Sequence, residues 1–223
     1  MTGSLPTMIG GLLSDCWSAL ALPGGSTIGS FVGESVRALL AKRQREAFDI
    51  LLEEMRKGDR LTRNASEIDP ILSMLLRYQR AAVEGTARLN LRLLAKAIRS
   101  QIALSNLVAD EFLHWADVLA TLRREEIVAL SAFLRHLDSA VVQAEPEDAR
   151  AGKAQMAMQA ELVPSGLFPT RDDLLATLGA LTRTGLVLSV AGWSDMLFEP
   201  TSRLRNLAKL APLEEALTDE AST

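Results

Sequence analysis

The sequence predicts a mainly α-helical protein, with long amphipathic helices packed as a bundle and a small C-terminal module that contains a short two-stranded hairpin. Alanine and leucine dominate the 223 residues, and aromatic residues make up only 4% of them, which favours helix over strand. Apolar residues recur at every third or fourth position through most of the chain, as on one face of a helix. Two short apolar runs near the C-terminus, joined by a glycine-containing link, have instead the pattern of a hairpin.

The composition excludes several classes of protein. With 48% apolar and 23% charged residues and a net charge of −4, the chain has material for a core and lacks the composition of a disordered protein. Its one cysteine cannot form an internal disulfide bond, and two histidines add few ligands for a structural zinc ion. We therefore expect no metal and no cofactor, and a cytoplasmic location as the default.

Residues 1–27 form an apolar N-terminal segment. No lysine or arginine precedes Arg37, so a signal peptide is not expected, and a Pro-Gly-Gly sequence cuts the segment below the length of a membrane span. We expect a helix over residues 6–22 that docks on the rest of the protein. An apolar stripe on this helix leaves open an alternative, association with a membrane surface through residues 5–33.

Residues 28–121 are expected to form a platform of long helices. A Ser-Thr pair can cap the first helix, which runs to about residue 57. The second opens at Pro70, because proline suits the first helical turn. No further proline occurs before Pro146, so this second element is expected to be one helix to about residue 104, bent near Gly85. A shorter helix completes the platform.

Residues 122–215 are expected to form the C-terminal module, followed by a frayed tail over residues 216–223. Two helices come first, and a third begins after Thr170, which forms an approximate capping box with Asp173. Gly185 is placed to close that helix in a left-handed conformation. The runs LVLSV and DMLFE then predict the hairpin, and RLRNLAKLAPLEEAL predicts the last helix. This order, a helix, a two-stranded wing and a helix, is that of a winged-helix-like module.

The end of the module carries a resemblance. The sequence LGALTRTGLV, a short wing and LFEPTSRLRNLAKL resemble the end of many winged-helix domains, although Glu199-Pro200-Thr201 departs from their usual Leu-Thr-x-x-Gly. FLHWADVLATLRREEIVALSAFLRH, followed by this module, is similar in layout to the abortive-infection alpha-type domain family of bacteria and phages. The resemblance covers about residues 66–210. It implies a defence or regulatory role linked to bacteria or phages.

The module does not have the charge of a DNA-binding domain. The helix after Thr170 begins with Asp172 and Asp173, and residues 165–210 have a net charge of only +1. Adjacent carboxylates are poor groups to place against DNA phosphates. These features favour a winged-helix-like module used for packing or protein contacts.

A row of basic residues is the clearest candidate binding feature. Six basic residues and one acid give residues 77–99 a net charge of +5, against −9 for the remainder. On one helix the six would fall within an arc of about 160°, with leucines mainly on the opposite side. Such a face could bind an anionic partner; the alternative is pairing with acids of a neighbouring helix, such as Glu53 and Glu54. The six are Arg77, Arg80, Arg88, Arg92, Lys96 and Arg99.

The sequence shows no catalytic constellation. His114 and His136 lack a nearby cysteine or an HExxH spacing, and Cys16 lies in an apolar segment without a neighbouring base. We therefore predict a non-enzymatic regulatory or protein-interaction protein that associates with itself or with a protein partner, and the resemblance adds a link to phage or host defence. Two alternatives stay open: nucleic-acid binding through the Arg77–Arg99 face, and membrane-surface association through the apolar N-terminus.

Overall fold

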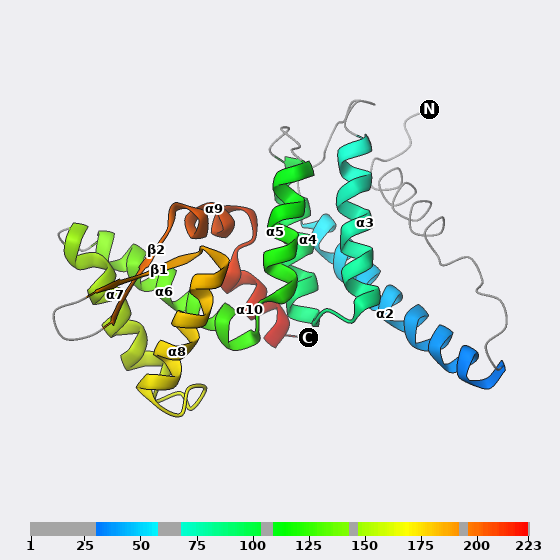
Figure 1. Ribbon diagram of the computed structural model, residues 1–223. Coiled ribbons are helices and arrows are strands. Elements are labelled where there is room, and N and C mark those ends of the chain that lie inside the picture. Colours follow the sequence, from blue (N-terminus) through cyan, green and yellow to red (C-terminus); the bar gives the residue numbers. More distant parts are fainter. Residues whose placement is uncertain (1–29, 58–67, 104–108, 143–146, 192–195, 223) are drawn as a thin grey trace. The chain divides into compact units, whose positions relative to one another are not determined.

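The computed structural model describes residues 30–57, 68–103, 109–142, 147–191 and 196–222. Over these residues the chain is mainly helical, with nine α-helices, one 3-10 turn and one antiparallel two-stranded hairpin near the C-terminus (Figure 1). The coarse fold class is therefore confirmed. The chain divides into two compact units, Met1–Thr121 and Leu122–Thr223, and each is described by itself. The expected helix over residues 6–22 lies outside the described residues.

The first unit is a bundle of four described helices. They are α2 (Ser30–Arg56), α3 (Ile68–Glu84), α4 (Arg88–Ala103) and α5 (Ala109–Thr121). Helix α4 packs against the other three, and 12 of its 16 residues are buried, as expected for a central helix. The buried Tyr78 hydroxyl donates a hydrogen bond to the Ala47 carbonyl at 2.7 Å, which ties α3 to α2.

The expectation of one continuous helix from residue 70 to about 104 is wrong, because α3 ends at Glu84 and α4 begins at Arg88. Gly85 has a left-handed φ of 88°. Its N–H bonds to the Ala82 carbonyl at 3.1 Å, and the next N–H, of Thr86, bonds to the Ala81 carbonyl at 3.0 Å. This pair of bonds is a Schellman motif, which satisfies the last carbonyls of a helix and ends it.

The second unit contains five described helices and a hairpin. Its first helices are α6 (Arg124–Val142), α7 (Glu147–Leu162) and α8 (Arg171–Leu181), and the short 3-10 turn η2 (Thr182–Thr184) follows. Strands β1 (Val187–Ala191) and β2 (Met196–Pro200) come next, and Leu188 lies opposite Glu199 and Val190 opposite Leu197. The chain ends in α9 (Ser202–Leu210) and α10 (Leu213–Ala221). The core is filled by side chains such as Phe133, Leu178, Phe198 and Leu207.

The local signals around α8 and the hairpin are confirmed. Thr170 is the N-cap of α8, and its capping box with Asp173 is complete. Gly185 has the expected left-handed φ of 68°, although it closes the 3-10 turn η2 and not α8 itself. Thr201 caps α9 and also donates its hydroxyl to the Gly185 carbonyl at 2.8 Å, so one side chain joins the base of the hairpin to the next helix.

The last helix differs from expectation in two ways. It divides at Ala211 and Pro212 into α9 and α10, because a proline inside the expected helix has no N–H to continue the ladder. Residues 216–221, which the sequence assigns to the tail, belong to the helix α10. Burial of Leu213 and Ala216 holds α10, which packs against α6.

Among the described residues, no helix is both long enough and apolar enough to span a membrane.

Candidate functional site

The six basic residues of the predicted binding row divide between two helices. On α3, Arg77 donates from Nε and Nη2 to Asp117 Oδ1 on α5 at 3.0 and 2.9 Å. Arg80 pairs within its own helix, from Nε to Glu84 Oε1 at 2.8 Å, and this hydrogen bond raises the pKa of Arg80. Arg88 is exposed at the first residue of α4.

The other three basic residues converge on one carboxylate of α2. Arg92 Nη1 lies 3.3 Å from Glu54 Oε1 and 2.9 Å from Glu53 Oε1. On the other oxygen, Glu54 Oε2, Lys96 Nζ lies at 3.3 Å and Arg99 Nη1 at 3.2 Å. We call these five residues the Glu54 cluster.

The Glu54 cluster follows from the helical periodicity of α2 and α4. Glu54 comes one turn after the buried Ile50 on α2, and Lys96 comes one turn after Arg92 on α4. The side chains of Glu54, Arg92 and Lys96 are all fully buried. Buried charges are tolerated only when they are paired, so the cluster fixes how α2 and α4 pack.

Glu53, the partly exposed carboxylate of the cluster, shows the effect of this pairing on a pKa. A hydrogen bond from Arg92, aided by Lys57, lowers the pKa of Glu53 below its usual value against the opposing effect of burial. The pairing with Glu53 and Glu54, which the sequence left open as an alternative, is thus present. Binding of an anionic partner by the basic row stays a prediction, and this pairing gives it no support.

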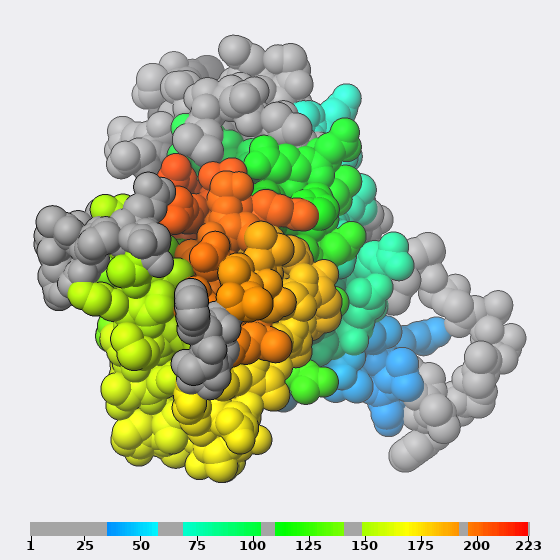
Figure 2. Space-filling view, turned by 60° about the vertical axis from the view of Figure 1, so that its left-hand side comes forward, coloured from blue at the N-terminus to red at the C-terminus, as the bar shows by residue number. Residues whose placement is uncertain are grey.

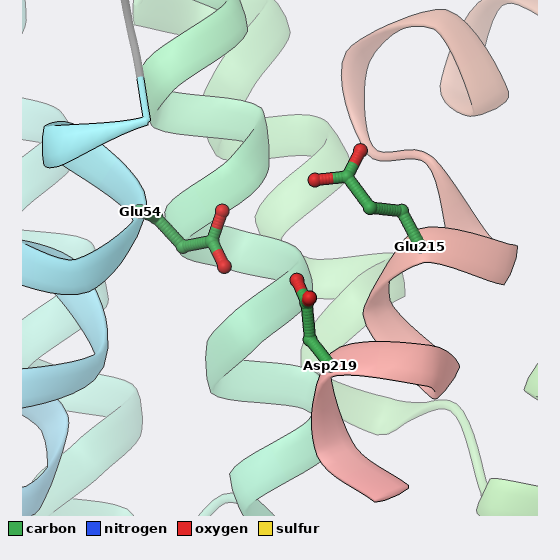
Figure 3. Close-up of side chains that lie close together, drawn as sticks. All are labelled: Glu54, Glu215 and Asp219. Carbon is green, nitrogen blue, oxygen red and sulfur yellow. The ribbon is translucent and has the colours of Figure 1, made fainter. Parts of the chain in front are cut away.

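The cluster is a poor place for a metal ion. Figure 3 shows the carboxylate of Glu54 on α2, and those of Glu215 and Asp219 on successive turns of α10. Glu54 belongs to the first unit and the other two to the second, so they are considered separately. Both oxygens of Glu54 already face cationic groups, including Lys57 Nζ at 3.1 Å from Oε1, and these cations would repel a divalent ion.

The second unit also pairs its charges internally. Arg183, in η2, donates from Nη2 to Glu126 Oε2 at 3.0 Å, and the Arg123 backbone N–H donates to the same oxygen at 2.8 Å. Burial alone would raise the pKa of Glu126, but these hydrogen bonds outweigh burial and lower it. The pair joins the turn after α8 to the start of α6.

A second ion pair joins α6 to α7. Glu161 accepts hydrogen bonds from Arg135 at 2.7 Å and contacts His136 Nε2 at 2.7 Å. Arg135 also faces Glu214 at 3.4 Å, beside an open groove of about 610 Å³ between α6, α9 and α10. His136, a residue without a catalytic neighbour in the sequence, is thus part of a structural pair.

His114 is exposed, with its ring edge-to-face against Trp115, and Cys16 lies outside the described residues.

Exposed apolar side chains gather on the hairpin. Leu188, Val190 and Met196 are 56%, 38% and 57% exposed, whereas Phe198 on β2 is fully buried. The exposed Met156 follows Gln155 on α7, the helix that packs against β2. We call Leu188, Ser189, Val190 and Met196 the hairpin surface. Strands β1 and β2, which carry it, are labelled in Figure 1, and Figure 2 is a space-filling view from another side.

The two outer edges of the hairpin differ. Gln155 of α7 covers the edge of β2, because its amide donates to the Met196 carbonyl at 3.1 Å and accepts from the Phe198 N–H at 2.9 Å. In the observed register the backbone groups of Ser189 and Ala191 point away from β2. Within the described residues no hydrogen bond reaches these groups, and residues 188–191 are all exposed.

Sequence reasoning found the hairpin but did not identify it as a candidate site. The available signal was the absence of lysine, proline or any charged residue from β1, since these are the residues with which proteins protect a free strand edge. A row of basic residues can be recognised directly in the sequence. The exposure of Leu188 or Val190 cannot, because it depends on which face of the hairpin the helices cover.

Comparisons of the chain with family models, with curated proteins and with solved structures found no match. The resemblance to abortive-infection alpha-type domains therefore stays a prediction.

Proposed function

We propose that this chain is a non-enzymatic protein-interaction protein, and that its contact surface is the hairpin surface of the second unit. The observation that carries the proposal is the outer edge of β1, where exposed apolar side chains flank backbone groups that no other described residue hydrogen-bonds. Such an edge can take up an extended peptide as an added strand, with main-chain hydrogen bonds for affinity and side-chain contacts for specificity.

In this proposal α6, α7, α8 and the hairpin act as a winged-helix-like module for protein contacts. The order of these elements supports the assignment. DNA binding is disfavoured by the first turn of α8, which carries Asp172 and Asp173, and by the hairpin, whose described strands contain Glu199 but no basic residue. Proteins that bind DNA neutralise phosphates with lysine and arginine.

Selection of peptides from a random library displayed on phage tests the proposal. The full chain is the target, and we expect enrichment of extended peptides rich in apolar residues. Their binding should be lost on Val190→Lys, which places a charge on the hairpin surface. It should survive Leu39→Lys, a matched change at an exposed apolar residue of α2. The proposal fails if no peptide is enriched, or if both variants bind the enriched peptides equally.

Titration with a random-sequence DNA duplex tests the nucleic-acid alternative. We expect no saturable binding at low salt, because five of the six basic residues pair with carboxylates. Binding that weakens steeply with salt, and that is lost when Arg80 and Arg88 are both changed to glutamate, would favour the alternative.

A further inference from the structure

We propose that the partner of the hairpin surface is a second copy of this chain, bound by antiparallel pairing of the two β1 edges. This inference rests on the proposed function and names its partner. An isologous contact places the same strand on both sides of a two-fold axis. The sequence of β1, VLSVA, suits it because an uncharged strand brings no like charges together.

The register of the pairing follows from burial along β1. Val187 is fully buried, backbone included, so it cannot join a second copy, whereas residues 188–191 are exposed. The outward backbone groups that remain belong to Ser189 and Ala191. Pairing Ser189 of each copy with Ala191 of the other satisfies these groups and places the two Val190 residues opposite each other on the axis.

The same register gives favourable side-chain contacts. Leu197 lies beside Val190 within the hairpin, so the pairing makes one apolar row of Leu197, Val190 and their two counterparts in the second copy. The hairpin's one described acid, Glu199, lies opposite Leu188 on β2. The two glutamates of a dimer are then separated by three strand spacings, about 14 Å, across the sheet and by four residues, about 13 Å, along the strands. At that separation, repulsion between exposed charges is largely screened.

The edge of β2 is not available for this pairing. Gln155 already occupies the outward groups of Met196 and Phe198. Each hairpin therefore offers one edge, β1, and two copies joined by this edge leave no further free edge of the same kind. The expected assembly is a closed dimer and not a fibre.

Sedimentation velocity over a wide range of protein concentration is the first test. We expect a monomer–dimer equilibrium that Ser189→Pro weakens by roughly thirtyfold, because each copy loses one outward N–H donor. The substitution leaves the hairpin's own ladder intact, since the Ser189 N–H points away from β2. Ser189→Ala keeps the donor and should leave the equilibrium unchanged. A protein that stays monomeric throughout, or a dimer that Ser189→Pro does not weaken, would overturn the inference.

Cysteine cross-linking tests the register with a covalent readout. In a Cys16→Ser background, Val190→Cys should form a disulfide-linked dimer under mild oxidation, because directly opposed residues of a non-hydrogen-bonded pair have Cα atoms about 4.5 Å apart. Leu188→Cys is the matched control: the two introduced thiols would be offset by four residues, about 13 Å along the strand, and should not link. Equal cross-linking of both variants would contradict the register.

The peptide selection separates failure of this inference from failure of the proposed function. A monomeric protein whose hairpin surface still enriches peptides overturns the second copy as the partner and keeps an interaction surface for another protein. A protein that neither dimerises nor enriches peptides overturns both.

Discussion

The Glu54 cluster of the first unit and the hairpin surface of the second place charged and apolar side chains in opposite environments. In the cluster, the fully buried cations Arg92 and Lys96 both pair with the fully buried Glu54. On the hairpin, Leu188 and Val190 are exposed beside backbone groups that find no hydrogen-bond partner in the described part of the chain. The comparison teaches that a row of charged residues in a sequence does not by itself mark a binding surface. Such residues can instead form ion pairs with oppositely charged residues of the same chain. An apolar strand can be the open surface when helices cover only one of its faces.

Glu54→Gln is expected to have the largest effect. The amide keeps the shape of the side chain but removes the negative charge that the buried Arg92 and Lys96 share, and removing one partner of a buried ion pair costs about 3 kcal/mol or more. Urea unfolding followed by circular dichroism measures the loss of free energy of unfolding. Glu53→Gln is the control, since that side chain is 46% exposed and its loss should cost less than about 1 kcal/mol. Equal losses would show that the cluster is not a buried network.

Arg183→Met tests whether internal pairing in the second unit contributes comparably. It removes two charge-assisted hydrogen bonds to the buried Glu126, and we expect a loss of about 2 kcal/mol at neutral pH. Arg171→Met is the control, because that guanidinium bonds to the neutral Gln159 and should contribute less. A larger loss for the control would show that the Glu126 pair is not the stronger link.

The Arg183 contribution has a predicted pH dependence. The pKa of Glu126 in the folded protein lies below its usual value of 4.5. The unfolded state therefore binds the proton more readily than the folded state in this range. The stabilisation is fully present above about pH 4.5 and is lost as the pH falls through the lowered pKa. The difference between wild type and Arg183→Met should shrink in acid; a difference that is constant with pH would contradict this.

Gly85→Ala tests why the two helices that carry the basic row are separate. A φ of 88° strains any residue with a Cβ, and the added methyl group would lie 3.0 Å from Arg43 Nη1, so we expect a loss of about 1–2 kcal/mol. The matched control is Gly152→Ala in α7, where the new Cβ would make an ordinary 3.8 Å contact with Leu197. Alanine should stabilise that helix by about 0.5–1 kcal/mol. A neutral Gly85→Ala would show that the turn can relax.

Val190→Lys and Arg80→Ala should have the smallest effects on stability. Val190 is exposed on the hairpin, and Arg80 makes an exposed pair with Glu84 within α3. Each change should alter the free energy of unfolding by less than about 0.5 kcal/mol. Urea unfolding of the monomer measures both. A large loss for Val190→Lys would mean that this side chain supports the fold and would weaken the contrast with the Glu54 cluster.

Much of the local structure was predictable because the interactions responsible lie within a few residues. The Thr170–Asp173 capping box, the left-handed Gly185 and the two strands all follow from side chains and backbone preferences near each position. The division of the expected long helix into α3 and α4 was harder to predict. A glycine such as Gly85 is compatible with a bent helix or with a helix end. Which of the two forms depends on the carbonyl groups to which the following N–H groups bond.

The sequence by itself determined a helical protein with a short apolar hairpin, because helix periodicity, caps and turns are local properties of the chain. Only the tertiary structure decided which residues of the basic row pair with carboxylates inside the protein. Packing of α2 on α4 brings Glu54 to Arg92 and Lys96, residues about 40 positions away that no local pattern relates. Tertiary structure also decided that Gln155 covers the edge of β2, whereas no described residue covers the edge of β1. An edge becomes a surface only when the rest of the fold leaves it uncovered.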